Sequence, residues 1–282
     1  MKLTMMCQND QAYEKLFDDL IQDVFGFSFK PWFEKKLWDK RYESYSLIDD
    51  GCMLANVCIF KTDMLLDGQP FRSHQFGAVA TRKSERGKGL SRRLMEHVLS
   101  KYPSVPAFLA ANPGVIDFYP RFGFRRVQTF KPFVSCELEQ KNRTAYKLHP
   151  DDDKIQSALN TRRCYSRLLD SINTQSVQMF HLMMDFPDQL YYLPGCDAIV
   201  IAEKEECRLL IADVISSKPV TFEQIKEELP FTGIKHIEFG FCPDWLGITP
   251  EWELVDTDEQ PYYIRGDWQL PKHFRFPALS ET

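Results

Sequence analysis

Several features that would place a chain in a familiar structural class are missing from these 282 residues. No apolar run approaches the roughly 18 residues that a membrane-spanning helix needs, and the N-terminal segment becomes polar too early for a signal peptide. The eight cysteines are scattered and include no Cys-x-x-Cys pair, so neither a zinc site nor a disulfide framework is expected. We therefore expect a cytoplasmic protein with reduced thiols, no bound metal and no membrane partner.

The charge of the chain changes sign near its middle. Residues 1–150 carry 23 Lys+Arg and 17 Asp+Glu, a net charge of +6, whereas residues 151–282 carry 12 and 23, a net charge of −11. This change favours two domains over one, which we place at residues 1–145 and 146–282 with the polar segment 139–143 at the joint. The positive charges form no single run and few aromatic residues lie among them, so we expect no nucleic-acid partner.

Hydrophobic periodicity and turn signals alternate between helix and strand along the chain, which predicts an α/β protein with mixed sheets. In the first half, the expected helices are 12–25, 31–38, 90–101 and 115–119, and the expected strands are 45–48, 52–60, 71–81, 106–111, 124–130 and 132–138. In the second half, we expect a helix from 151 towards 169, a hairpin of 198–202 with 208–215, a helix at 221–229 and a strand at 234–241. Hairpin, helix and strand thus recur in one order, which indicates internal duplication.

A basic loop with two glycines, between a strand and a helix, is the most informative segment. The strand ends at residues 77–81, Gly-Ala-Val-Ala-Thr, and the loop 86–91, Arg-Gly-Lys-Gly-Leu-Ser, leads into the helix. Free backbone N–H groups and the positive end of the helix dipole meet there, which favours binding of phosphate. The loop is no Walker A motif, because Gly89 follows Lys88, and no dinucleotide motif, because Arg92 occupies the third glycine position. A surface helix without a ligand is the alternative.

Two ordered motifs resemble those of the GNAT superfamily of N-acetyltransferases. The loop resembles the pyrophosphate motif Arg/Gln-x-x-Gly-x-Gly/Ala, although Ser91 replaces the last Gly or Ala. About twenty residues later, the segments 108–112 and 117–124 resemble the strand–helix pattern that ends in Phe-Tyr-x-x-x-Gly-Phe. The resemblance covers about residues 5 to 140, and the segment 77–81 resembles that of the enhanced-intracellular-survival type. It implies a GNAT fold for the N-terminal domain and acetyl-CoA as co-substrate.

The resemblance also implies roles for individual residues. The backbone of Val79, Ala80 and Thr81 would pair with the pantetheine arm, with the Val79 N–H facing the thioester carbonyl. Asn112 would reach the same arm. The residues of the loop would hold the pyrophosphate; they are Arg86, Gly87, Lys88, Gly89, Leu90 and Ser91.

Tyr119 stands where the family places the acid that protonates the departing thiolate. The pKa of a tyrosine, near ~10, exceeds the ~8.5 of a thiol, so full proton transfer from Tyr119 is unfavourable. We expect instead a hydrogen bond from Tyr119 that strengthens as the thiolate forms. The alternative is a core tyrosine that packs beside Phe118 and Phe122.

The general base is not evident from the sequence. Many relatives carry a glutamate on the central strand eleven residues before the motif arginine, where this chain has Gln75. Gln75 is no base but could orient a water. His74 should face the opposite side of the sheet, because side chains alternate along a strand, and could serve only if the strand were bulged. A water chain or an amine that is already partly neutral is the alternative that we favour.

The second half carries no Arg-x-x-Gly-x-Gly/Ala loop, and Pro219 would remove a donor from any phosphate cradle there. We therefore interpret it as a degenerate GNAT-like domain that serves packing or substrate recognition. Its acidity could attract a cationic amine or be ordinary solvated charge. The aromatic tail 271–282 predicts docking across both domains. We favour a tail that stays out of the site over one whose Thr282 carboxylate acts as base, an arrangement that the resemblance makes conceivable.

These observations predict an N-acetyltransferase that moves an acetyl group from acetyl-CoA to a primary amine of a small molecule or peptide by direct attack. The alternative is a non-catalytic acyl-CoA-binding sensor, which the missing carboxylate on the central strand favours and Tyr119 disfavours. Nucleic-acid binding is a third, weaker reading, which would show a steep salt dependence. Acceptor identity and oligomeric state do not follow from the sequence, because acceptor pockets are built by variable loops.

Overall fold

The computed structural model describes residues 1–6, 10–138, 144–256, 258 and 261–282. The predicted joint, residues 139–143, lies outside the described residues. The helices are α1 (Gln11–Phe25), α2 (Lys30–Glu34), α3 (Leu90–Lys101), α4 (Asp153–Thr161), α5 (Gln175–Met184) and α6 (Phe222–Glu228). The strands are β1 (Lys2–Met6), β2 (Tyr42–Asp49), β3 (Cys52–Leu66), β4 (Gln69–Thr81), β5 (Ala107–Ala110), β6 (Arg125–Val127), β7 (Phe130–Ser135), β8 (Tyr146–Lys147), β9 (Leu169–Ile172), β10 (Leu190–Leu193), β11 (Ala198–Glu205), β12 (Arg208–Ser216), β13 (His236–Phe239), β14 (Glu251–Leu254) and β15 (Tyr262–Arg265).

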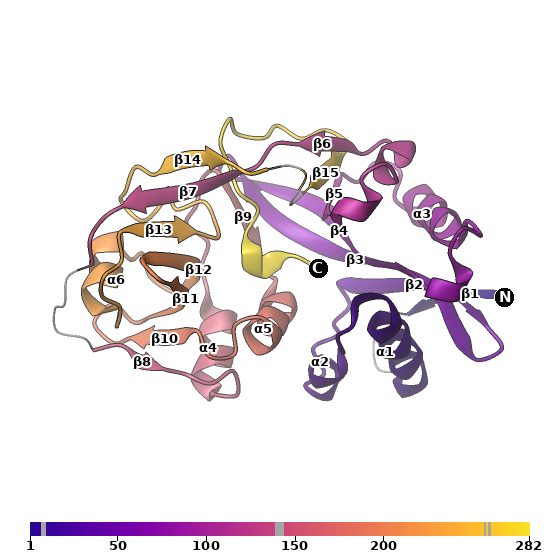
Figure 1. Ribbon diagram of the computed structural model, residues 1–282, viewed down its shortest axis with the longest axis horizontal. Coiled ribbons are helices and arrows are strands. Elements are labelled where there is room, and N and C mark those ends of the chain that lie inside the picture. The colour runs from indigo at the N-terminus through magenta and orange to yellow at the C-terminus, as the bar shows by residue number, and fades with distance from the viewer. Residues whose placement is uncertain (7–9, 139–143, 257, 259–260) are drawn as a thin grey trace.

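Two mixed sheets lie side by side, and they confirm the predicted α/β class (Figure 1). The first has the order β1-β2-β3-β4-β5-β15-β6, with β9 paired to β3, and the second has the order β14-β7-β13-β12-β11-β10-β8. The turn between β2 and β3 places Asp50 and Gly51 at φ of 45° and 70°, the positive values that a tight hairpin requires. Thr221 and Gln224 form the predicted capping box of α6.

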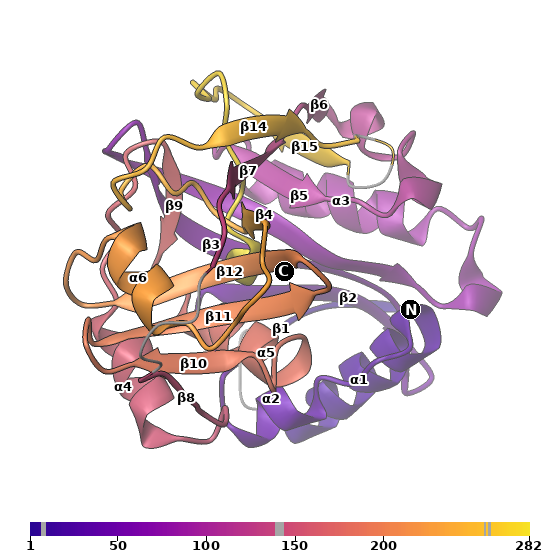
Figure 2. The ribbon, with the colours of Figure 1, turned by 60° about the vertical axis from the view of Figure 1, so that its left-hand side comes forward.

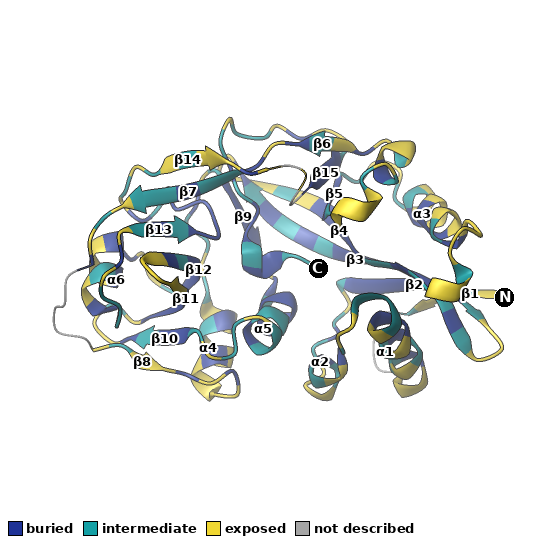
Figure 3. Cartoon of the chain, viewed as in Figure 1, coloured by how far each residue is buried: buried dark blue, intermediate teal, exposed yellow. Residues whose placement is uncertain are grey.

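Helices cover both faces of the first sheet. Alternate residues of β3 face opposite ways: Val57 and Ile59 pack with α3, whereas Cys58 and Phe60 pack with α1. Figure 3 shows both helices buried toward the sheet and exposed on their outer sides. The core of this half is therefore divided between the two faces of one sheet.

Strands cross between the two halves of the chain, an arrangement that the sequence did not predict: the first half gives β7 to the second sheet, and the second half gives β9 and β15 to the first. β15 lies antiparallel between β5 and β6 of the first sheet, and β7 lies antiparallel between β13 and β14 of the second. Figures 1 and 2 show β7 among the strands of the second half and β15 beside β5 and β6. The division into sheets thus does not follow the proposed boundary at 145/146, and a fragment of residues 1–145 would lack β9 and β15.

The same order of elements recurs in both sheets, as expected for a duplication. In the first, an antiparallel hairpin of β3 and β4 is followed by α3 and by β5, which is parallel to β4. In the second, the hairpin of β11 and β12 is followed by α6 and by β13, which is parallel to β12. The second sheet therefore repeats the topology of the first.

Three local expectations differ from the structure. The helix expected at 115–119 is replaced by two 3₁₀ turns, Pro113–Val115 and Tyr119–Phe122, because Pro120 cannot donate a helical hydrogen bond. The helix expected to run towards Leu169 ends at Thr161. Beyond it the Arg162 guanidinium is buried, 3.4 Å from a carboxylate oxygen of Asp170 and of Asp213, and this pairing draws the chain inward. The helix α5 was not expected.

Candidate functional site

A β-bulge interrupts the central strand β4 at the end where the loop begins. Asn56 pairs with Ala80 and Cys58 with Gly77, so two residues of β4, Ala78 and Val79, stand opposite one residue of β3. Ala78 has a positive φ of 45°. A bulge leaves one residue without a hydrogen-bonding partner on the neighbouring strand and changes the direction of the strand. Backbone groups at the bulge are therefore available to a ligand.

The neighbouring strand separates from β4 beside this bulge. β4 and β5 pair in parallel only at His74 with Ala107 and at Gln75 with Phe108 among the residues described. Farther along, Gly77 to Val79 on one strand and Ala110 to Asn112 on the other line a cavity of about 1070 Å³. An extended molecule can therefore lie between the two strands and hydrogen-bond to the bulged backbone.

The glycine loop and the start of α3 form one end of this cavity. Gly87 and Gly89 have φ of 80° and 75°, values that only glycine adopts without strain. No side chain caps the N-terminus of α3 among the described residues, so its first N–H groups are available to an anion. Arg86 lies beside them in the cavity wall. This end is suited to a pyrophosphate.

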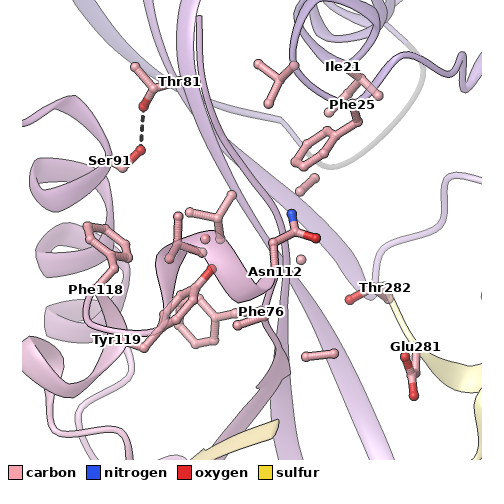
Figure 4. A pocket seen from close by; sticks show the side chains of 18 of the residues that line it. Ile21, Phe25, Phe76, Thr81, Ser91, Asn112, Phe118, Tyr119, Glu281 and Thr282 are labelled. Atoms are coloured by element: carbon pink, nitrogen blue, oxygen red, sulfur yellow. Dashed lines mark hydrogen bonds between the residues drawn. The ribbon is translucent and has the colours of Figure 1, made fainter. Parts of the chain in front are cut away.

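The structure brings nine of the eleven predicted site residues into this cavity. They are Val79, Thr81, Arg86, Gly87, Gly89, Leu90, Ser91, Asn112 and Tyr119. Ala80 instead faces the core under α1, because side chains alternate along a strand, and Lys88 pairs with Glu85 over 2.8 Å. The Ser91 hydroxyl, which could have contacted phosphate, hydrogen-bonds to that of Thr81 (Figure 4).

Tyr119 is buried and its hydroxyl points into the cavity (Figure 4). Burial, and to a lesser extent Tyr263, raises the pKa of Tyr119 to about 12. Full proton transfer from it to a thiolate would then be uphill by about 5 kcal/mol, which favours a hydrogen bond over acid catalysis. Tyr263, on strand β15, lies 5.7 Å from Tyr119 between ring centroids and so supports it from the other half of the chain.

The C-terminal tail docks against both halves, as predicted. Phe274, Phe276 and Leu279 are buried, and Phe276 stacks on Phe108 of β5 at 4.8 Å. The Ala278 N–H donates to the Gly240 carbonyl oxygen of the second half over 2.8 Å. The tail therefore fastens the two sheets together.

The expectation that the tail stays out of the site is wrong, because Glu281 and Thr282 line the cavity. The side-chain amide of Gln75 makes two hydrogen bonds to the tail. Its N–H donates to the Ser280 carbonyl oxygen (2.8 Å), and its oxygen accepts from the Thr282 backbone N–H (3.0 Å). Gln75 thus holds the tail. Burial, opposed by His181 and aided by Asp185, raises the pKa of Glu281 to about 7. Glu281 was not predicted at this site, because its position there depends on the fold of the tail.

His74 faces away from the cavity, as strand alternation predicted. Its ring packs edge-on against Tyr102 at 4.5 Å. Burial, together with Lys61 and against the opposing effect of Glu43, lowers the pKa of His74 to about 4. It is not among the residues that line the cavity.

Within the described ranges, no group of three His, Cys, Asp or Glu side chains could hold a metal ion. No helix of the same residues is long and apolar enough to cross a membrane.

A bulged strand, a partner strand that separates from it and a glycine loop at a helix N-terminus form a cavity in this α/β protein whose shape suits an extended, phosphate-bearing ligand. Residues 9–127 match the family described as acetyltransferase (GNAT) domain. This segment is therefore similar to a GNAT acetyltransferase domain. Comparison with curated proteins gives no match.

Solved structures resemble almost the whole chain. A conserved protein of Enterococcus faecalis V583 is 15% identical with a TM-score of 0.61, and the match covers 94% of this chain and 73% of that one. Eis1 from Mycobacterium abscessus is 12% identical with a TM-score of 0.58, over 94% and 73%. A GCN5-related N-acetyltransferase from Kribbella flavida is 13% identical with a TM-score of 0.55, over 93% and 70%. At these identities the likeness concerns the fold.

Proposed function

We propose that the protein is an N-acetyltransferase that moves an acetyl group from acetyl-CoA to a primary amine by direct attack. The observation that carries this proposal is the bulge at Ala78 and Val79 beside the separating end of β5, with the glycine loop and Tyr119 in the same cavity. The amine nitrogen attacks the thioester carbonyl carbon, the C–N bond forms, the C–S bond breaks and the thiolate leaves.

The residues of the chain divide this work among them. The bulged backbone at Val79 supplies an N–H to the carbonyl oxygen as it becomes an oxyanion, an interaction worth roughly 10²–10³ in rate where such donors have been removed. The loop 86–91 holds the pyrophosphate, and Asn112 contacts the arm between it and the thioester. Tyr119 hydrogen-bonds to the sulfur as negative charge develops on it.

We assign removal of the ammonium proton to Glu281, directly or through one water. Glu281 is one of the residues that line the cavity, and a pKa of about 7 suits a general base near neutral pH. The Thr282 carboxylate considered above remains a second candidate, and a Glu281→Gln variant distinguishes them. If Glu281 is the base, this variant loses the rise in kcat/KM through about pH 7; if it is not, the rise is retained.

The experiment that tests the function is an incubation of the full chain with acetyl-CoA and a pool of amines. Free thiol is followed over time, and mass spectrometry identifies the acetylated amine. Amine-dependent thiol release supports the enzyme. Tight acetyl-CoA binding without amine-dependent thiol release would support the non-catalytic acyl-CoA sensor. The presence of Gln75 in place of an acidic residue is the sequence feature that agrees with this alternative. We place the reaction in the cytoplasm, where the free cysteines would stay reduced.

A further inference from the structure

The cavity extends beyond the separated strands into a chamber walled by aromatic rings. Its aromatic residues come from α1, α2, β2, α5 and the segment between α1 and α2; they are Phe25, Phe27, Phe29, Trp32, Tyr42 and Phe180. Phe29 stacks on Phe180 at 4.8 Å between centroids, and Phe27 lies 5.4 Å from Phe29 and 6.0 Å from Phe180. Both halves of the chain thus contribute to one apolar wall.

Part of this wall presents uncovered apolar surface to the cavity. Phe27 is 38% exposed, and Phe25 and Phe180 are half-buried. The Trp32 indole N–H already donates to the Ser176 carbonyl over 2.8 Å, so its ring adds apolar surface without a free donor. Exposed apolar surface in a concave site favours a ligand that covers it with apolar groups of its own.

The chamber contains little negative charge for a cationic ligand to pair with. Of the 23 Asp+Glu in residues 151–282, Glu281 is the only described one that lines the cavity. Both ring nitrogens of His181 already have hydrogen-bond partners: Nδ1 lies 2.6 Å from Asp185 Oδ2, and Nε2 lies 2.7 Å from the Glu281 carbonyl oxygen. Among its described residues, the second half therefore brings only the carboxyl groups of Glu281 and of the chain terminus at Thr282 to the cavity. A polyamine would find fewer carboxyl groups there than it has charges.

One polar group at the end of the chamber has no hydrogen-bond partner among the described residues. It is the buried Thr282 Oγ1, and such groups are costly when left unpaired. Figure 4 shows Thr282 and Glu281 on one side of the cavity, with Ile21 and Phe25 above and Asn112 and Tyr119 across from them. An amine here would face both the tail and the acyl donor.

We infer that this chamber takes a primary monoamine with an apolar aryl or alkyl body. The body lies against the phenylalanine rings, and the amine faces Glu281 and Thr282 at the tail. The faces of the rings also attract a cationic amine as it enters. The inference rests on the proposed function, since it names the acceptor for the same site.

The test compares acceptors with the full chain and acetyl-CoA, by thiol release. The acceptors are 2-phenylethylamine, hexylamine and spermidine. We expect kcat/KM to be at least about tenfold higher for the two monoamines, because each buries apolar area worth more than ~1.4 kcal/mol. Preference for spermidine overturns the inference but leaves the proposed function intact. Absence of acetyl-CoA binding, measured by calorimetry, would instead remove the proposed function.

Two variants separate the chamber from a general loss of structure. Phe27→Ala, at an exposed position, should lower kcat/KM for 2-phenylethylamine about tenfold and leave the Kd for acetyl-CoA unchanged. Phe33→Ala is the matched control, because Phe33 also packs against Phe29 but is not among the residues that line the cavity. Equal effects of both variants would overturn the inference. So would octanoyl-CoA binding more tightly than acetyl-CoA in a Phe27-dependent way, since the chamber would then hold the acyl chain.

Discussion

The Asn56 side chain donates a hydrogen bond to the carbonyl oxygen of Ala78, 3.0 Å away, at the bulge of the central strand. Asn56 is fully buried, and its amide oxygen accepts from the hydroxyls of Ser44 and Ser46 at 2.5 and 2.8 Å. Its remaining amide hydrogen faces the Cys58 sulfur at 3.1 Å. A side chain with every hydrogen-bonding position in use fixes the bulged carbonyl, and so the direction of the Val79 N–H.

Replacement of Asn56 by alanine should therefore impair both stability and turnover. We expect a loss of roughly 2 to 3 kcal/mol in the free energy of unfolding, because two hydroxyls and one carbonyl lose a buried partner. In addition, kcat of the folded fraction should fall about tenfold while the Kd for acetyl-CoA changes little. Cys58→Ala is the control: Cys58 is equally buried, but the hydrogen bond to the Ala78 carbonyl comes from Asn56, so this variant should retain kcat. A normal kcat in folded Asn56→Ala would show that the contact is structural only.

Gly89→Glu should abolish acetyl-CoA binding, measured by calorimetry. Glu at this position puts a side chain and a negative charge where we place the pyrophosphate, at the N-terminus of α3. Gly233→Glu is a matched control, because Gly233 also has a positive φ, 69°, and open space around it, so it carries the same strain and charge outside the cavity. Unchanged affinity in folded Gly89→Glu would remove the basis for the loop assignment.

Tyr119→Phe should lower kcat while the Kd for acetyl-CoA stays close to that of the wild type. The phenol makes its interaction with sulfur mainly in the transition state, and its ring remains in place against Phe118 and Tyr263. Turnover is measured with the amine that the acceptor screen identifies. Unaltered kcat would mean that Tyr119 is a packing residue.

Gly77→Ala should displace the tail. A Cβ on Gly77 would lie 2.5 Å from the Thr282 backbone oxygen and 2.6 Å from its Oγ1, closer than real contacts allow. We expect faster carboxypeptidase cleavage and faster hydrogen exchange in residues 276–282. Gly114→Ala, which meets open space in the same cavity, should leave both rates unchanged.

Deleting residues 279–282 extends the same test to activity. A stable protein without turnover would support a catalytic role of the tail. Full activity would exclude one, and a large drop in Tm would show that the tail chiefly fastens the two sheets.

Glu281→Gln should stabilise the protein at alkaline pH and not at acid pH. The pKa of Glu281 is raised in the folded state to about 7 from 4.5, so folding favours the protonated form. The contribution of the wild-type residue to stability therefore falls as pH rises from 4.5 to about 7 and stays low above it. Gln imitates the protonated form at every pH. We expect the variant to have the higher Tm at about pH 8 and an equal Tm at about pH 5; the reverse pattern would contradict the raised pKa.

Features that depend on near neighbours in the chain followed from the sequence. The hairpin at Asp50 and Gly51, the capping box at Thr221 and the loop before α3 each rest on contacts within a few residues. Strand alternation likewise placed His74 on the far side of the sheet. Residue type and spacing fix such features before any tertiary contact forms.

The tertiary structure alone decided which distant segments complete the site. β15 supplies Tyr263, which packs against Tyr119. Nothing in the local sequence indicates that β15 joins the first sheet and β7 the second, because a strand can pair with any neighbour whose hydrophobic pattern matches. Likewise, Gln75 occupies the position of a glutamate in many relatives, yet its amide binds the tail and brings Glu281 to the cavity. By resemblance, the sequence predicted a site for acyl-CoA. The acceptor side that we propose depends instead on contacts between residues more than 100 positions apart, such as Trp32 and Ser176.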